Sequence, residues 1–301
     1  MRVGLLFDFP QPDGGDAVAT AVQLGLGDAE PRVDLVRELA HGLPGGSAGE
    51  VEAAFDRLVA AGCTAVVGPS ISDNCAIARD LADAARLPCI NYSGGAFTRS
   101  EWMFHYQVGS LEEEPVVIAE HLRTRGLASA AVLYDRSHVG EGYVAHLPRW
   151  LEVTSRAGVD PLAEEAVADV EAARASSPDA LVYLGLGVVA RTVALAVHEL
   201  AWDVPVVCNS ALMFGYGRKD WRAGWDGWTY VDTVADDNRV RAALRETSKA
   251  TAAGPIGVAA YDMGRLLAEA IAWAPSATPA GLRDGLEHVK RLPAASGHDG
   301  T

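Results

Sequence analysis

The chain has 301 residues, which is more than one hydrophobic core usually covers, so its length favours two domains of roughly 100–200 residues each. Apolar residues make up 49% and charged residues 22%, as in ordinary globular proteins. The balance of 25 basic against 40 acidic residues gives a net charge of −15, which argues against a nucleic-acid-binding surface. No run approaches the ~20 consecutive apolar residues that a membrane-spanning helix needs.

The first residues lead directly into an apolar run at 3–7, which ends at Asp8 and lacks the pattern of a signal peptide. We therefore expect an extracytoplasmic protein, periplasmic or on the cell surface, if an export signal precedes this sequence, and a cytoplasmic protein otherwise. The cysteines form no CxxC pair and have no histidine at metal-ligand spacing. We expect no metal site, and no disulfide among Cys63, Cys75, Cys89 and Cys208.

Short apolar runs alternate with helical patterns along the chain. The predicted strands are residues 3–7, 32–36, 65–67, 89–92, 104–108, 130–134, 180–184, 204–208 and 228–231. The predicted helices begin near Asp16 and then cover residues 50–61, 76–85, 111–122, a segment after Tyr143, 188–201 and 257–272, with loops at 8–15 and 135–143. Because crossover helices join parallel strands, this alternation predicts an α/β protein with mostly parallel sheets.

Two loops rich in Gly and Ser follow the neighbouring strands at 65–67 and 89–92. One contains Ser70 and Ser72, and the other contains Ser93 and Gly95. The carboxyl ends of parallel strands lie side by side, and ligands bind at this edge of open sheets. Serine hydroxyls and free backbone N–H groups at a helix start suit an anionic or strongly polar ligand group. The alternative is that Gly and Ser are ordinary turn residues here.

Six motifs occur in order over nearly the whole chain: VVGPSIS at 66–72, INYSGG at 90–95, LYDRSHVGEGY at 133–143, ALVYLGLG at 180–187, VPVVCNSA at 204–211 and AAYDMGRLLAEAI at 259–271. This set resembles the type I periplasmic binding fold and, within it, the branched-chain amino-acid (Leu/Ile/Val) binding protein family of ABC transporters. The resemblance implies two Rossmann-like lobes with parallel sheets, joined by crossing hinge strands, with one ligand in the cleft between the lobes. We expect an N-terminal lobe of residues 1–110 and 235–301 and a C-terminal lobe of residues 111–234.

In family members, the residues that match Ser72, Ser93 and Gly95 clamp the ligand's carboxylate with hydroxyls and backbone N–H groups. Amino-acid binders have a tyrosine where Gly187 lies and, where Ser210 lies, an acid that pairs with the ligand's ammonium group. An unpaired buried ammonium costs several kcal/mol, and Ser210 supplies no charge. Asp232, at the end of a neighbouring strand, is a candidate for that charge, and its alternative is helix capping or loop solvation. We therefore expect a small carboxylate- or amide-bearing organic ligand, amino-acid-like or an aromatic acid, but not a plain branched-chain amino acid, in a cleft that Gly187 enlarges.

Three further candidates follow from the resemblance. His138 falls where the family often places a tyrosine that faces the ligand, and its alternative is an exposed loop position. Phe9 and Tyr261 are candidate apolar walls of the site, and the alternative for both is core packing. Family members usually continue with another strand pair after residues 292–297, so we also expect a shortened lobe.

The predicted function is a non-enzymatic solute-binding protein whose partners are a small-molecule ligand and an ABC permease, with no cofactor, as a monomer or weak dimer. The alternative is a cytoplasmic sensor on the same fold, resembling amide sensors, with a regulator protein as its partner. An enzyme is disfavoured because His138 and Asp135 lie in one short loop, whereas a catalytic triad needs a histidine and an aspartate that converge from separated positions. A DNA-binding repressor on this fold is disfavoured by the charge and by the lack of an N-terminal helix-turn-helix.

Overall fold

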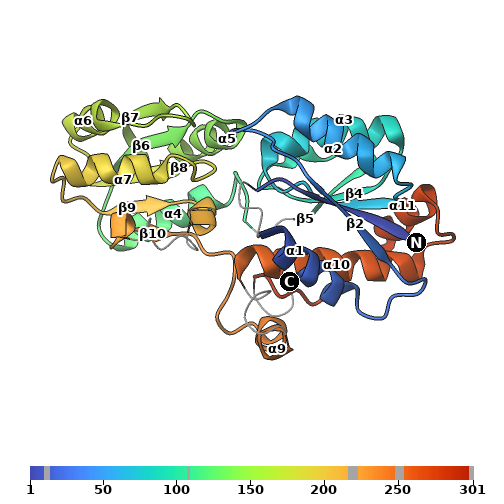
Figure 1. The fold of residues 1–301 in the computed structure, drawn as a ribbon. Coiled ribbons are helices and arrows are strands. Elements are labelled where there is room, and N and C mark those ends of the chain that lie inside the picture. The colour runs from blue at the N-terminus through green and yellow to red at the C-terminus, as the bar shows by residue number, and fades with distance from the viewer. Residues whose placement is uncertain (10–13, 107–108, 216–222, 248–253, 298–301) are drawn as a thin grey trace. The chain divides into compact units, whose positions relative to one another are not determined.

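The computed structural model describes residues 1–9, 14–106, 109–215, 223–247 and 254–297. The chain divides into two compact units (Figure 1). Unit 1 contains Met1–Val108 and Thr233–Thr301, and unit 2 contains Gly109–Asp232. The chain therefore leaves unit 1 once and returns to it.

Unit 1 is built on a five-stranded sheet with the order β2-β1-β3-β4-β5, in which every pair of neighbours is parallel. Its first part contains β1 (Arg2–Phe7), α1 (Gly14–Leu26), β2 (Asp34–Leu39), α2 (Ala48–Ala60), β3 (Ala65–Val67), α3 (Ser72–Ala85), β4 (Cys89–Tyr92), the 3-10 turn η1 (Ala96–Thr98) and β5 (Met103–Tyr106). Its second part contributes α9 (Arg239–Thr247), α10 (Pro255–Trp273) and α11 (Pro279–His288).

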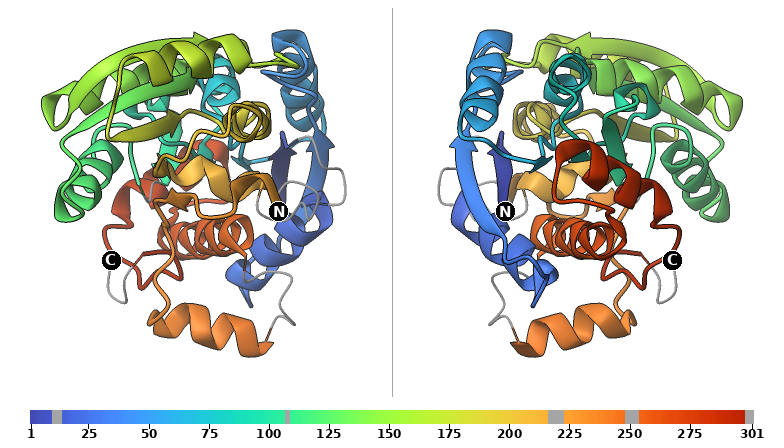
Figure 2. Two further views of the ribbon diagram at one scale, coloured as in Figure 1. Left: turned by 90° about the vertical axis from the view of Figure 1, so that its left-hand side faces the viewer. Right: turned by 90° about the vertical axis from the view of Figure 1, so that its right-hand side faces the viewer.

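Helices cover both faces of the sheet of unit 1. On one face, α2 and α3 pack on the strands around buried side chains such as Phe55, Leu58 and Met103. On the other face, α1 and α10 lie side by side (Figures 1 and 2). Glycines permit their close approach, because a Cβ on Gly264 would come within 2.3 Å of the carbonyl oxygen of Val22. The two-part unit is thus joined through the α1–α10 contact.

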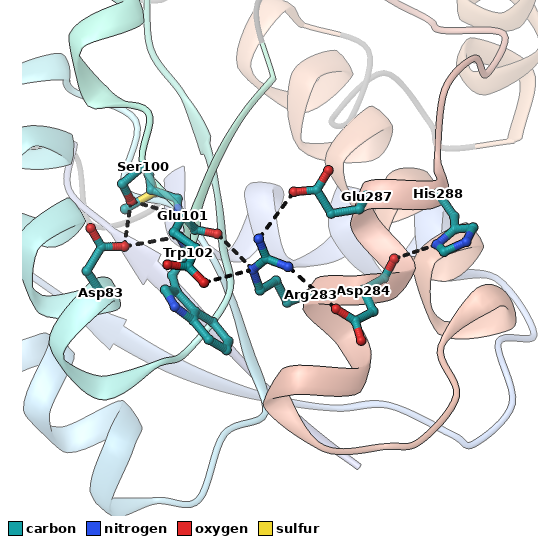
Figure 3. Close-up of polar contacts among 9 residues, drawn as sticks. Asp83, Ser100, Glu101, Trp102, Arg283, Asp284, Glu287 and His288 are labelled. Carbon is teal, nitrogen blue, oxygen red and sulfur yellow. Dashed lines mark hydrogen bonds and ion pairs between the residues drawn. The ribbon is translucent and has the colours of Figure 1, made fainter.

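Helix α11 is fastened to the loop before β5 by Arg283 (Figure 3). The guanidinium carbon of Arg283 lies 5.7 Å from the centre of the Trp102 ring, and its Nε donates to the carbonyl oxygen of Glu101 at 3.1 Å. Ion pairs of 3.5–3.8 Å join Arg283 to Glu101, Asp284 and Glu287. A cation stacked on an aromatic face is stabilising, so this contact attaches the C-terminal part of unit 1 to its sheet.

Unit 2 is built on a second five-stranded parallel sheet, with the order β10-β9-β8-β6-β7. Its elements are α4 (Glu114–Thr124), β6 (Ser129–Asp135), α5 (His138–His146), η2 (Leu147–Arg149), β7 (Glu152–Val159), α6 (Val167–Ala175), β8 (Ala180–Leu184), α7 (Ala190–Glu199), β9 (Val206–Cys208), η3 (Ser210–Gly215), η4 (Ala223–Trp225) and β10 (Thr229–Tyr230). The predicted α/β fold with parallel sheets is confirmed for both units.

The inner strands β6 and β8 of unit 2 are buried on both faces. In β6, Ala130 and Val132 belong to one core cluster with α4 and α5, whereas Ala131 and Leu133 belong to another cluster with α6 and α7. A strand that is covered on both sides reads as a continuous apolar run rather than an alternating one. This explains why residues 130–134 and 180–184 could be identified as strands from the sequence.

Several predicted boundaries were wrong. Helix α5 begins at His138, inside the predicted loop at 135–143, and Ser137 is its N-cap, with its hydroxyl accepting the N–H of Gly140. Glycines weakened the helical signal of this segment in the sequence, because glycine has low helix propensity. Packing requires a glycine at 142, since a Cβ there would lie 2.6 Å from a methyl carbon of Leu111. The sequence did not predict four elements, β7, α6, α9 and α11. Two predicted segments lie partly outside the described residues: the strand at 104–108 at residues 107–108, and the loop at 8–15 at residues 10–13. Within the described ranges, no helix is long and apolar enough to cross a membrane.

Candidate functional site

Asp8 directly follows β1 at the carboxyl edge of the sheet of unit 1. Its carboxylate accepts the backbone N–H groups of Ser70 and Ile71, both at 2.9 Å, and the side-chain amide of Asn74 at 3.0 Å. Burial raises the pKa of Asp8, and these three hydrogen bonds oppose the rise. The N–H groups of Ser70 and Ile71, which precede the first residue of α3, are therefore engaged inside the chain.

Ser72, Ser93 and Gly95 are brought together by two hydrogen bonds. The hydroxyl of Ser93 donates to the hydroxyl oxygen of Ser72 at 2.9 Å, and the N–H of Gly95 donates to the hydroxyl oxygen of Ser93 at 3.1 Å. The N–H of Gly95 is therefore engaged inside the chain, which corrects the expectation that it stays open for a ligand. Because the proton of Ser93 goes to Ser72, the proton of Ser72 remains available to donate.

His105 on β5 supports this serine pair and was missed in the sequence. Its Nε2 is hydrogen-bonded to the carbonyl oxygen of Ser93, and Arg99 donates from Nε to its Nδ1 at 2.9 Å. Because Nδ1 accepts, the ring proton lies on Nε2 and points at Ser93. His105 thus fixes the backbone that carries the Ser93 hydroxyl. No spacing rule links a strand histidine to a loop carbonyl 12 residues away, so only the strand pairing reveals it.

The two predicted apolar walls lie in packed surroundings. The Phe9 ring is buried, 5.6 Å from the Phe7 ring and tilted by 55°. Tyr261 lies half-buried on α10, with the guanidinium carbon of Arg265 at 5.9 Å from its ring centre. These contacts fit the packing role that the sequence left open as the alternative for both residues.

Next to Tyr261, the buried Asp262 joins the end of β5 to the C-terminal segment of unit 1. It accepts the hydroxyl of Tyr106 at 2.6 Å and the N–H groups of Ala295 and Ser296 at 2.7 and 2.9 Å. Burial, together with the Asp262 charge, raises the pKa of Tyr106 well above its usual range, so its hydroxyl remains protonated and donates. Asp262 therefore stabilises the part of unit 1 near which the chain leaves this unit, after β5, and later returns to it.

Asp135 ends β6 at the carboxyl edge of unit 2. Its two carboxylate oxygens accept the N–H of Leu186 at 2.8 and 3.1 Å. Gly185 has a positive φ of 132°, and a Cβ there would lie 1.4 Å from the carboxylate oxygen of Asp135. Gly187 also has a positive φ, 82°, and its Cβ would lie 2.8 Å from the carbonyl oxygen of Ala211. Backbone conformation and close packing thus account for the glycine at 187, and its effect on the size of a ligand cleft stays a prediction.

Ser210, at the start of η3, is bound to a carboxylate that the sequence did not connect with it. Glu114, the first residue of α4, accepts the N–H of Ser210 at 2.7 Å, its hydroxyl at 2.9 Å and the hydroxyl of Tyr143 at 2.8 Å. Glu114 is 2% exposed, and burial raises its pKa to about 7 against the opposing effect of these hydrogen bonds. Ser210 carries no charge itself, and the carboxylate beside it comes from Glu114, which was not predicted from the sequence.

A sequence signal for Glu114 was present. Glu114, Ile118 and Leu122 recur at the four-residue spacing of one helical face, and all three are buried. The three consecutive glutamates at 112–114 lie at the start of the predicted helix, where any of their carboxylates complements the helix dipole. The periodicity separates Glu114 from the other two, which are exposed.

His138 is the first residue of α5 and is exposed, as its non-functional alternative predicted, although it lies in a helix and not a loop. The four cysteines are buried and carry free thiols. Among the described residues, no group of three or more His, Cys, Asp or Glu side chains is arranged to hold a metal ion. The polar chemistry of the two edges therefore comes from hydroxyls, backbone N–H groups and buried carboxylates.

A family model described as periplasmic binding protein matches residues 44–300. LivJ from Streptococcus pneumoniae, a branched-chain amino acid transporter substrate-binding protein solved with isoleucine, has 16% identity and a TM-score of 0.82 over 100% of this chain and 91% of that chain. The leucine-binding protein LivK from Thermotoga maritima has 14% identity and a TM-score of 0.81, over 99% and 90%. An ABC transporter substrate-binding protein from Desulfitobacterium hafniense, in complex with Leu, has 18% identity and a TM-score of 0.78, over 99% and 91%. No curated protein matches the chain significantly in sequence.

Proposed function

Because the chain belongs to the periplasmic binding protein family, we propose that it is the solute-binding protein of an ABC transporter and binds a small carboxylate- or amide-bearing organic ligand. The similar structures with isoleucine and with Leu support an amino-acid-like compound as the first class to consider. The partner is the permease of that transporter, and the location is extracytoplasmic, as the family's name implies. The role is non-enzymatic, and the protein acts as a monomer or weak dimer.

The observation that carries this proposal is the hydroxyl pair of unit 1. Ser93 donates to Ser72, so Ser72 is left with a proton that suits an acceptor such as a carboxylate or amide oxygen. Ser72 lies in the first turn of α3, where backbone N–H groups have no partner within the helix. A hydroxyl beside such groups is a suitable place for a ligand oxygen.

Ser72→Ala tests the proposal. A thermal-shift screen of amino acids, aromatic acids, amides and short-chain acids first selects a binding compound, because ligand binding raises the melting temperature by mass action. Calorimetry with that compound is then expected to show binding about tenfold to a hundredfold weaker in Ser72→Ala, since a charge-assisted hydrogen bond contributes roughly 1.5–3 kcal/mol. The matched control is Ser100→Ala, which removes a hydroxyl before β5, where it donates to Asp83. The proposal fails if Ser72→Ala binds like the parent protein.

A further inference from the structure

Both protons of Ser210 are committed to one carboxylate. Its N–H donates to one oxygen of Glu114 at 2.7 Å, and its hydroxyl donates to the other at 2.9 Å. A hydroxyl whose proton is used in this way retains only its lone pairs for further partners. Ser210 is half-buried, whereas Glu114 is almost fully buried behind it. At the edge of unit 2, Ser210 therefore offers an acceptor to an approaching group, whereas Ser72 in unit 1 offers a donor.

We propose that Glu114 is a positioning residue that makes Ser210 an acceptor for a donor-bearing ligand group, an ammonium or amide N–H, and that links the binding of such ligands to its own ionisation. This inference rests on the proposed solute-binding function and narrows its ligand class. It differs from the expectation from the sequence, in which Ser210 supplies no charge and a ligand ammonium would be left unpaired.

The link to ionisation follows from the count of donors around Glu114. The ionised carboxylate accepts from Ser210 twice and from Tyr143 once. A protonated carboxyl must place its own proton, and this proton competes with the donors already present. The hydroxyl of Ser210 would then turn away or accept, and it would no longer be held as an acceptor for a ligand donor.

The ionisation occurs in an accessible pH range. Burial raises the pKa of Glu114 to about 7. The titratable group that faces it is Tyr143 from α5, whose pKa is raised well above its usual range by burial and by the charge of Glu114, so Tyr143 keeps its proton. The other group is Ser210, and no ion pair within the described part of the chain involves Glu114. Glu114 is therefore the group that changes charge at this site near neutral pH.

The experiment compares two probes of nearly equal shape, L-leucine and 4-methylpentanoate, of which only L-leucine carries an ammonium group. Calorimetry at pH 6 and pH 8 measures their affinities for the parent protein, Glu114→Gln and Ser210→Ala. L-leucine is expected to bind the parent about tenfold more weakly at pH 6, because one unit below a pKa only about a tenth of a carboxyl group is ionised. At pH 7, in buffers of different ionisation enthalpy, its binding is expected to release about half a proton.

In Glu114→Gln, the dependence on pH and the proton release are expected to disappear, while every histidine of the chain is retained. Ser210→Ala keeps the carboxylate and is expected to weaken the binding of L-leucine at pH 8 more than it weakens the binding of 4-methylpentanoate. Ser210→Ala decides the inference if Glu114→Gln does not fold.

Two outcomes overturn the inference alone. One is equal affinity of both probes for the parent protein, and the other is the same pH dependence for L-leucine in the parent and in Glu114→Gln. In both cases binding is observed, so the proposed function stands. If neither probe binds at millimolar concentration, the inference is overturned for this ligand class, and the result of Ser72→Ala with the compound selected by thermal shift decides the proposed function separately.

Discussion

Unit 1 has the strand order β2-β1-β3-β4-β5, and unit 2 has the equivalent order β7-β6-β8-β9-β10 when its sheet is read from the β7 edge. In each unit an aspartate stands at the carboxyl end of the second strand in that order. Asp8 follows β1, and Asp135 ends β6. Each carboxylate accepts backbone N–H groups from the loop after the neighbouring strand: Ser70 and Ile71 after β3, and Leu186 after β8. At both edges, a carboxylate thus accepts the N–H groups of a loop that leads into a helix, groups that have no partner within the helix.

The units differ in what lies beside these aspartates. In unit 1, Ser93 donates to Ser72, and both groups are neutral hydroxyls. In unit 2, Ser210 donates to the buried carboxylate of Glu114. A buried carboxylate loses more hydration than a buried hydroxyl does, and its charge responds to pH, whereas a hydroxyl pair does not titrate near neutral pH. The same backbone frame therefore carries a pH-independent donor in one unit and a pH-dependent acceptor in the other.

The largest expected effect is on the free energy of unfolding, and it concerns Gly185, which packs against Asp135 at the edge of unit 2. Gly185→Ala would place a Cβ 1.4 Å from the carboxylate oxygen of Asp135 and force a side chain into a φ of 132°. We expect the free energy of unfolding to fall by about 3–5 kcal/mol, measured by urea denaturation. Gly227→Ala is the matched control, because Gly227 also has a positive φ, 80°, but has no atom within 4 Å of its Cβ position.

A double mutant separates the clash from the backbone strain. Gly68 follows β3 in unit 1, as Gly185 follows β8 in unit 2, but its Cβ would meet the backbone oxygen of Leu6 at 2.2 Å. We expect Asp135→Ala to recover part of the loss caused by Gly185→Ala, a coupling of about 1–2 kcal/mol, and Asp8→Ala to recover nothing from Gly68→Ala. Additive losses in unit 2 would show that the carboxylate does not require the glycine.

Stability against pH gives the next effect in size. Below pH 4.5, the usual pKa of a glutamate, Glu114 is protonated in both the folded and the unfolded state. Between 4.5 and about 7 the unfolded chain has lost the proton that the folded chain retains, so stability falls as the pH rises, and above about 7 this dependence ends. The loss is up to about 3 kcal/mol, at 1.36 kcal/mol per pKa unit.

Urea denaturation at pH 5, 6, 7 and 8 checks this expectation. The difference in unfolding free energy between the parent and Glu114→Gln should change in favour of the variant as the pH rises. No comparable change is expected for Ser72→Ala, because the hydroxyl pair of unit 1 does not titrate. A difference that stays constant from pH 5 to pH 8 contradicts an elevated pKa for Glu114.

The sequence was sufficient for most of the fold because buried parallel strands leave a local signal. Residues 89–92 and 180–184 were identified as strands with the bounds of β4 and β8. The edge strand β7 was missed, since its side chains are mostly half-buried and its residues, EVTSRAGV, show no apolar run. Helix α5 was misplaced because Gly140 and Gly142 have low helix propensity, and tertiary packing rather than propensity determines their conformation.

The candidate site was predictable where its residues share one edge through adjacent strands. Ser72 and Ser93 follow β3 and β4, and parallel pairing alone places them together. Glu114 meets Ser210 across 96 residues of sequence, through helix packing that no local pattern encodes. The sequence therefore did not reveal the hydrogen-bond partner of each polar group, or which group of each pair donates.

The smallest expected effect concerns an attachment that helps to fix the C-terminal part of unit 1. Arg283 on α11 is partly covered, stacks on Trp102 and donates to the carbonyl oxygen of Glu101 (Figure 3). Arg123 in unit 2, by contrast, forms one exposed ion pair, with Glu120. Arg283→Ala is expected to lower the unfolding free energy by about 1–2 kcal/mol, because it removes a cation–aromatic contact and a hydrogen bond. Arg123→Ala should change it by less than about 0.5 kcal/mol, since exposed pairs contribute little.

Arg283→Lys keeps the charge and loses the planar stack, so a loss close to that of Arg283→Ala would attribute the effect to the ring contact. Full retention of stability in Arg283→Lys would instead assign it to the three neighbouring carboxylates, and 0.5 M salt would then remove most of it.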